Sequence, residues 1–330
     1  MTTAAEPALL WAIAILFGSL CIGSIIRFIA LRNAETATRK KRLASLRTWW
    51  MLAALVSVGL LFGRLGICLL LLGASCAAWN ELTRMLGPRE EDRLAIHAGY
   101  VLIVLNYTLI LLDKGNLYLV FLPVAGILVL AFCLLSQGEP KGYISSAGAL
   151  LWGLLFLGYG VSHAAYLTIL PAASTGPMGP AGWILFLVIL TESDDIFQAV
   201  IGRLFGSHKR HRISPVISPN KTWEGFIGGF LVILVLALLL APWFTTLTAQ
   251  AGPINLPDSL QAIVAPALVA VLISIAGFFG DINMSAIKRD SGVKDSSGML
   301  PGMGGIIDRI DSISMTAPVY VYFIIGWSGV

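Results

Sequence analysis

Residues 223–248 read WEGFIGGFLVILVLALLLAPWFTTLT, with Glu224 as the one charged side chain in the run. A helix that crosses the hydrocarbon core of a bilayer needs about 20 mainly apolar residues, whereas a strand of a membrane barrel needs about 9–11. A run of this length and composition therefore predicts a transmembrane helix.

Further apolar segments of the same character divide the rest of the chain into spans with short connections. They cover residues 8–31, 49–62, 65–80, 95–112, 117–135, 144–170, 181–202, 262–284 and 313–329. The segments at 49–62 and 65–80 are short, so they form either two spans or one span with a re-entrant piece. We expect an all-α polytopic membrane protein with about ten spans, within a range of eight to ten.

The composition excludes a set of ordinary soluble domains. Of the 330 residues 57% are hydrophobic and only 12% are charged, against roughly 25% charged in a typical soluble domain. The net charge of +4 is too small to argue for nucleic acid as a partner. Membrane lipids are the expected surroundings.

The basic residues are concentrated in alternate connections. Residues 32–47 hold Arg32, Arg39, Lys40, Lys41, Arg42 and Arg47 against the single acid Glu35. The connections at 84–93, 203–221 and 288–309 are basic too, whereas 113–116, 171–182 and 247–261 hold one lysine and no arginine. Because basic loops stay in the cytoplasm, we expect both termini outside and the basic side in the cytoplasm, across a bacterial inner membrane.

Chemically informative residues gather in the later part of the chain. We expect residues 1–180 to supply packing, topology and dimer contacts, and residues 181–330 to form the catalytic region. In residues 191–229, a span ends with Glu192, Asp194 and Asp195, and acids at such a place mark functional sites by default.

The next stretch has the character of a phosphate site. Residues 197–222 hold no acid, and 218–222 (SPNKT) lead directly into the helix predicted at 223. Backbone amides, hydroxyls and the Lys221 ammonium would meet there at a positive helix terminus. A capped helix with a lysine that extends to the membrane surface is the structural alternative.

Residues 280–312 contain the second cluster. Asp308 and Asp311 are three residues apart, so a helix would place them on one face, and Asp281 ends a neighbouring apolar helix. Carboxylates with no nearby Cys or His favour Mg²⁺ over zinc. The alternative is a salt-bridge network with Lys288, Arg289 and Arg309. Carboxylates for Mg²⁺ beside lysines for phosphate are the parts needed for phosphoryl or nucleotidyl transfer.

The same residues resemble the signature of the CTP:phosphatidate cytidylyltransferases, the CDP-diacylglycerol synthases. The matching stretches are 202–206 (GRLFG), 218–225 (SPNKTWEG), 285–289 (SAIKR), 294–295 (KD) and 301–311 (PGMGGIIDRID). The first 180 residues resemble the family only as apolar spans. The resemblance implies that a phosphatidate phosphate attacks the α-phosphorus of CTP, giving CDP-diacylglycerol and pyrophosphate. It also implies a homodimer.

The resemblance assigns roles to individual residues. The metal ligands would be Asp281, Asp308 and Asp311, which hold Mg²⁺, alone or with a second cation. The catalytic residues would be these three with Lys221, Lys288 and Arg289. The nucleotide and substrate would contact Asp195, Ser218, Asn220, Lys221, Thr222, Ser285, Lys294, Asp295 and Arg309.

Two positions depart from the family pattern. Met303 stands where the family has a histidine, and Ala199 stands where it commonly has a tyrosine. Methionine neither transfers a proton nor binds Mg²⁺, but the second pKa of a phosphate monoester is near 6, so the attacking phosphate needs no strong base. We expect a reduced rate or an altered substrate.

Three alternatives follow. The acceptor would be another lipid phosphate, such as a polyprenyl phosphate. Alternatively, the chain is a catalytically silent family member that acts as a binding or regulatory subunit. In the third alternative, the acids line a path for cation transport. Their position at the ends of the spans argues against this alternative.

Overall fold

The computed structural model describes residues 7–32, 35–171, 178–206, 211–248 and 257–328, and these are helical almost throughout. Within these ranges, nine helical stretches are long and apolar enough to cross a bilayer. The chain is an all-α polytopic membrane protein, as the apolar runs predict, and the number of spans lies within the expected range.

The first three helices are α1 (Pro7–Ala30), α2 (Thr36–Leu61) and α3 (Gly63–Leu86). The two short apolar segments thus become two full helices, α2 and α3, and no re-entrant piece forms. Gly63 makes the tight junction between them with a φ of +60°, a conformation that glycine adopts without steric cost.

Helix α2 begins well before its apolar part, which corrects the expectation that residues 32–47 form a loop. Arg39, Arg42 and Arg47 lie in its first turns. Arginine, lysine, alanine and leucine all have high helix propensity, so the helix continues out of the apolar run. The basic residues therefore project from a helix end.

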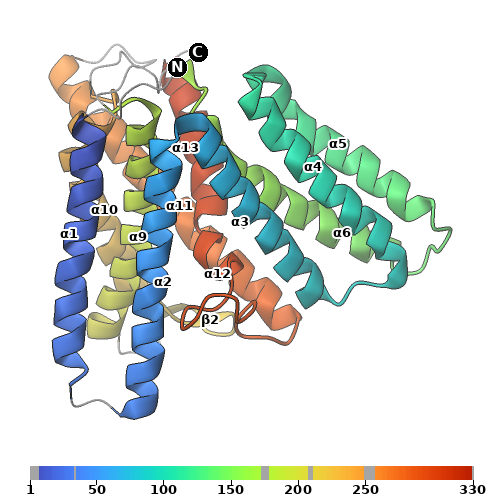
Figure 1. Ribbon diagram of the computed structural model, residues 1–330, viewed down its shortest axis with the longest axis horizontal. Coiled ribbons are helices and arrows are strands. Elements are labelled where there is room, and N and C mark those ends of the chain that lie inside the picture. Colours follow the sequence, from blue (N-terminus) through green and yellow to red (C-terminus); the bar gives the residue numbers. More distant parts are fainter. Residues whose placement is uncertain (1–6, 33–34, 172–177, 207–210, 249–256, 329–330) are drawn as a thin grey trace.

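The next helices form a group of their own beside α3, as Figure 1 shows in green. They are α4 (Arg93–Leu111), which follows a short 3₁₀ turn at Glu90–Asp92, α5 (Gly115–Leu135) and α6 (Tyr143–Gly153). A π-helical stretch, Leu154–Gly160, continues α6 into α7 (Val161–Tyr166). The predicted segment 144–170 is therefore one span with a π-helical middle.

The remaining elements carry the motifs. They are α9 (Gly179–Phe205), β1 (Arg212–Ser214), β2 (Ser218–Thr222), α10 (Trp223–Phe244), α11 (Asp258–Asp290), α12 (Ile307–Ile310) and α13 (Ile313–Ser328). Helix α9 corresponds to the predicted segment 181–202, the one predicted segment that is not among the nine helices above. It is as long as the nine spans but carries Glu192, Asp194 and Asp195 in its second half.

The interior is filled by large side chains, and the outside is apolar as well. Trp79, Trp183 and Phe186 are fully buried between helices. Helix α1 by contrast exposes Trp11, 70% of whose surface is accessible, and other large apolar residues. In a helix that spans a bilayer, such side chains contact lipid.

The ends of the bundle differ in content. Helix α1 begins and α13 finishes at one end, whereas the end of α1, the start of α2, the β-hairpin and the loop after α11 lie at the other (Figure 1). This arrangement agrees with an even number of crossings. The predicted basic residues Lys209 and Arg210 lie outside the described residues, as do 172–177 and 249–256 of two predicted outside connections. The predicted division at residue 180 stays a prediction.

Candidate active site

Segments that are far apart in the sequence meet at the end of the bundle that carries the β-hairpin. They are the middle of α9, strand β2, the end of α11 and the loop 291–306 with α12 (Figure 1). In the hairpin, Arg212 pairs with Thr222 and Ser214 with Ser218. This short antiparallel pair holds Lys221 at the entrance to α10.

Lys221 is the centre of the first polar cluster. Its Nζ lies 2.7 Å from Asp281 Oδ2 and donates to Gln198 Oε1 at 3.1 Å, and it lies 5.6 Å from the centre of the Phe278 ring. Burial alone would lower the pKa of Lys221, but the negative charges of Asp281 and Asp195 outweigh it, so the pKa is raised above its usual value. Lys221 is therefore a buried cation among acids.

Small residues in α10 bring α9 to this lysine. The Thr222 hydroxyl caps α10 by accepting a hydrogen bond from Gly225 N at 3.1 Å. A Cβ on Gly225 would lie 2.5 Å from Gln198 O, and one on Gly229 would lie 2.5 Å from Gln198 Cγ. Only glycine allows this approach. The alternative of a capped helix is thus confirmed for Thr222, whereas the lysine beside it points inward.

Asp194 extends the cluster into the helix core. It is 2% exposed and accepts hydrogen bonds from Gln198 Nε2 at 2.8 Å and from Ser274 Oγ at 3.4 Å. The sequence analysis noted Asp194 among the acids at the end of this span but assigned it no role, and it did not predict Gln198 as a site residue. Their spacing of four residues on one helix face, directly after an apolar run, is the signal that could have linked them.

Three carboxylates from different elements face one another next to Lys221. Asp195 accepts from Ser312 Oγ at 2.6 Å through Oδ2, while its Oδ1 is buried without a partner among the described residues. Asp311 lies close enough to Asp281 and Asp195 for their negative charges to repel. Ser285 donates to Asp281 at 3.4 Å.

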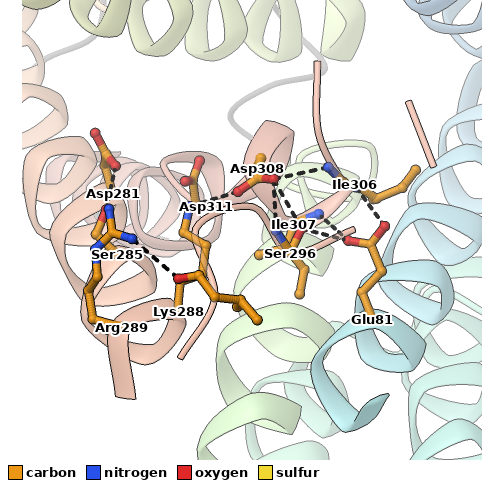
Figure 2. A network of polar contacts seen from close by, with 12 residues as sticks. Glu81, Asp281, Ser285, Lys288, Arg289, Ser296, Ile306, Ile307, Asp308 and Asp311 are labelled. Carbon is orange, nitrogen blue, oxygen red and sulfur yellow. Dashed lines mark hydrogen bonds and ion pairs between the residues drawn. The ribbon is translucent and has the colours of Figure 1, made fainter. Parts of the chain in front are cut away.

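Asp308 forms the second cluster. Its Oδ1 accepts from Lys288 Nζ at 2.7 Å, and its Oδ2 accepts from the amides of Ser296 and Gly305 at 3.2 and 3.0 Å. Both members of the ion pair are nearly buried, with 12% and 11% of their side chains exposed. Of the three basic residues in the predicted salt-bridge network, Lys288 is the one that pairs with an acid among the described residues. Figure 2 shows how the Lys288–Asp308 pair ties α11 to α12.

Glu81 of α3 is a site residue that the sequence analysis missed. It is 3% exposed, and it accepts hydrogen bonds from Ser296 Oγ at 3.1 Å, Ser297 Oγ at 2.5 Å, and the amides of Ile306 and Ile307 at 3.0 Å each. The loop that carries Asp308 is thus held from both sides (Figure 2). An acid in a membrane helix was the available signal, but the predicted span stopped at residue 80.

The donor chemistry around these acids fits Mg²⁺. No group of three acidic, histidine or cysteine side chains within the described ranges forms a preassembled metal cage. Instead, lysines neutralise Asp281 and Asp308. The groups present are nevertheless all hard oxygen donors, and the buried Asp195 Oδ1 lacks any partner in the described structure.

The other predicted residues are less closely engaged. Ser218 and Asn220 lie on the hairpin, and Asn220 is exposed, as is Lys294 in the loop. The exposed Arg289 donates to Val293 O at 3.3 Å. Asp295 and Arg309 line a cavity of about 490 Å³ beside the loop.

The two departures from the family pattern lie in different environments. Met303 also lines this cavity, in a turn closed by the hydrogen bond that its backbone N–H donates to Leu300 O at 3.0 Å. Ala199 is exposed on α9, whereas Gln198 before it points to Lys221. The departure at 303 is therefore a change in the cavity wall, and the one at 199 is not part of the Lys221 cluster.

Comparison with known proteins agrees with this arrangement. The model of the cytidylyltransferase family matches residues 43–326. The uncharacterized protein YnbB of Escherichia coli K12 is 38% identical over 314 residues, which cover 95% of this chain and 97% of that protein. The phosphatidate cytidylyltransferase of Brucella abortus is 30% identical over 261 residues, 79% of this chain and 85% of that protein. The enzyme of the same name from Haemophilus influenzae is 38% identical over 140 residues, 42% of this chain and 44% of that one.

The family match spans both the motif-bearing helices and the N-terminal helices from α2 onward, including Glu81. The resemblance based on the motifs alone is thereby extended to most of the chain. With the lysine–carboxylate pairs at one end of a membrane helix bundle, these matches establish that the chain belongs to the cytidylyltransferase family.

Proposed function

We propose that this chain transfers the cytidylyl group of CTP to the phosphate of phosphatidate, giving CDP-diacylglycerol and pyrophosphate. The observation that carries the proposal is the meeting of two lysine–carboxylate pairs, the partly buried Lys221–Asp281 and the nearly buried Lys288–Asp308, at the end of helices whose outer faces are apolar. The printed names of two relatives, both phosphatidate cytidylyltransferases, support it.

The reaction exchanges one phosphoanhydride bond for another. An oxygen of the lipid phosphate forms a bond to the α-phosphorus of CTP. The bond from that phosphorus to the oxygen that bridges to the β-phosphorus breaks, and pyrophosphate leaves with the electron pair. Since the second pKa of a phosphate monoester is near 6, the attacking oxygen is largely deprotonated at neutral pH. The methionine at 303 is compatible with this chemistry.

The residues of the chain would mainly neutralise and position charge. The ammonium groups of Lys221 and Lys288 would bind phosphate oxygens that compete with their present carboxylate partners, and Arg309 would bind from the cavity side. Mg²⁺ is the proposed cofactor, held by Asp281, Asp308 and Asp311, and when bound it would neutralise charge on the triphosphate and the leaving pyrophosphate. A second cation beside Asp195 is part of the same proposal.

The proposed setting follows from the distribution of charge. The basic first turns of α2 lie at the same end of the bundle as the site (Figure 1). By the positive-inside rule this end would face the cytoplasm, where CTP is soluble, across a bacterial inner membrane. A homodimer remains part of the proposal.

The direct test supplies purified protein in nanodiscs with labelled CTP, Mg²⁺ and a panel of lipid phosphates. We expect a labelled CDP-lipid with phosphatidate, and none without Mg²⁺. Folded protein that makes no product from any lipid phosphate would refute the proposal and would leave the silent subunit as the better explanation.

A second candidate is transfer to a different lipid phosphate, and the position of Met303 in the cavity wall favours it. The same panel separates the two, because the preferred acceptor shows the highest kcat/KM. A polyprenyl phosphate used at least ten times better than phosphatidate would decide for this candidate.

A further inference from the structure

We infer that the cavity between α2 and the loop 291–306 binds the nucleoside part of the nucleotide, with Trp49 as the surface on which the base stacks. The inference rests on the proposed function and adds a binding site from the N-terminal half of the chain. Its volume of about 490 Å³ is within the range of roughly 300–1,000 Å³ typical of small-molecule sites.

The cavity adjoins the catalytic cluster. Gly304 forms part of its wall, and a Cβ on Gly304 would lie 2.6 Å from Asp308 Oδ2. Arg309, which follows Asp308 directly, lines the same cavity. A nucleoside in the cavity would therefore have its phosphates directed toward Asp308 and Lys288.

Helix α2 is fixed to this loop. Thr48 is 3% exposed, and its hydroxyl donates to Pro301 O at 2.9 Å. This bond ties α2 to the start of the glycine-rich turn 301–305. The next residue, Trp49, then forms one wall of the cavity with Ser45, one turn earlier.

The lining has the mixed character that a base and sugar require. Within the described part of the chain, the Trp49 indole N–H, the Ser45 hydroxyl, the Asp295 carboxylate and Arg309 Nε form no hydrogen bond. An aromatic face stacks a base, and a carboxylate accepts from the exocyclic amine of cytosine. The single arginine would be left for a phosphate.

The cavity suits an acyl chain less well. An apolar groove of about 570 Å³ lies elsewhere, between α11 and α13, lined by residues such as Phe279, Ile282 and Val319. A hydrocarbon chain would lose fewer polar contacts there than among Asp295 and Arg309. The polar cavity is therefore the better place for the nucleoside.

Trp49 can be tested against its neighbour Trp50. Trp50 donates its indole N–H to Ser24 Oγ of α1 at 3.0 Å, and its ring lies 5.7 Å from that of Phe17. It is the same residue type on the same helix turn, but it packs against α1. Substitutions at Trp49 and Trp50 therefore compare the loss of a tryptophan that lines the cavity with the loss of one that packs against α1.

The experiment measures equilibrium binding of labelled CTP to the purified full-length chain with Mg²⁺, together with KM for each substrate. We expect Trp49→Ala to raise the Kd for CTP by on the order of tenfold, as loss of one base–aromatic stack predicts. Trp49→Phe should stay within about threefold of wild type because it keeps an aromatic face. Trp50→Ala should leave the Kd unchanged.

The choice of base is tested at Asp295. A carboxylate accepts a hydrogen bond from the amine of cytosine but is repelled by the carbonyl of uracil. The side-chain amide of asparagine can accept from the amine or donate to the carbonyl. Asp295→Asn should therefore reduce the preference for CTP over UTP by about fivefold or more. Its thermal unfolding should match that of wild type because Asp295 is exposed.

The outcomes separate this inference from the proposed function. Unchanged CTP and UTP binding in both Trp49→Ala and Asp295→Asn would overturn the inference and make Trp49 a membrane-interface anchor, even if CDP-lipid forms. A raised KM for the lipid phosphate with unchanged CTP binding would assign the cavity to the acceptor and also overturn it. CTP binding that depends on Trp49, without any CDP-lipid product, would support the cavity and refute the proposed function.

Discussion

Glu81 illustrates how one side chain can organise the loop of a candidate active site without being part of the motif. Its two oxygens accept four hydrogen bonds from the loop that positions Asp308. Polar partners of this kind orient the ligands of a metal site, and their loss typically costs 10–100-fold in affinity or activity.

Glu81→Gln should therefore lower kcat about 10- to 100-fold, because the amide would place a donor against loop groups that also donate. The measurement is steady-state turnover with saturating CTP and lipid phosphate. Glu90→Gln is the matched control, since the Glu90 side chain is 81% exposed and pairs with Arg93. Full kcat in Glu81→Gln would show that the loop does not need this anchor.

The aspartates in the cluster carry the metal hypothesis. Asp308→Asn and Asp311→Asn should each reduce turnover about hundredfold or more. The cation loses a carboxylate ligand, and the phosphates then lose the cation that neutralises them. Membrane insertion should be intact, as measured by the yield of folded protein in the membrane fraction. Asp290→Asn, at the exposed end of α11, controls for loss of a nearby charge, and ordinary turnover in both site variants would show the metal assignment to be wrong.

Lys221 is predicted to act on the nucleotide. Lys221→Met removes the ammonium that faces Asp281 and Asp195, and it should raise KM for CTP about tenfold because a charge-assisted contact to phosphate is lost. Lys114→Met, at the start of α5, removes a lysine outside the Lys221 cluster and should leave KM unchanged. An unaltered dependence on CTP in Lys221→Met would remove Lys221 from the phosphate site.

At the scale of elements, the close packing of α9 and α10 decides whether Gln198 and Asp194 reach Lys221. Gly229→Ala places a methyl group 2.5 Å from Gln198 Cγ, and such overpacking costs roughly 1–3 kcal/mol. We expect a lower unfolding temperature and reduced turnover. Gly73→Ala, on α3 with no atom within 4 Å of the new Cβ, should be neutral or stabilising, and equal effects at both positions would argue against helix packing as the cause.

Helix existence was predictable from the apolar runs, but helix extent was not. The apolar pattern marks the part of α2 that lies in lipid. Its basic first turns lie outside the bilayer, where the helix depends on the helix propensity of the residues. The same limit placed the end of the third segment at residue 80, one residue short of Glu81. Residues just outside an apolar run are where functional side chains of a membrane helix can be overlooked.

At the scale of the whole molecule, the charge distribution predicts which way the bundle faces. The α4–α5 connection lies at the end of the bundle where α1 begins (Figure 1). Asn116→Cys, in the first turn of α5 next to this connection, should react with an impermeant maleimide in intact cells. Gln137→Cys, in the connection that follows α5, should react only after permeabilisation. Both are made in a background without the four native cysteines, and the reverse pattern would place the site outside the cytoplasm.

The sequence by itself determined that this is a helical membrane protein, and it marked residues 191–229 and 280–312 as the candidate site. The helical fold of each span can be predicted from its own sequence, because in a bilayer each span must satisfy its own backbone hydrogen bonds and exclude charge. The motif residues Lys221, Asp281, Lys288 and Asp308 were visible for the same reason, as scarce charges in an apolar chain.

Only the tertiary structure decided which of these charges meet and what supports them. Lys221 pairs with Asp281 and Lys288 with Asp308, while Glu81 and Thr48 hold the loop from helices more than 200 positions earlier. Such contacts arise from how helices pack, which depends on small residues and side-chain shapes at each crossing. Hydrophobic periodicity reports burial along one helix and contains no information about the partner helix, so only the assembled bundle brings Glu81 and Thr48 to the loop before α12.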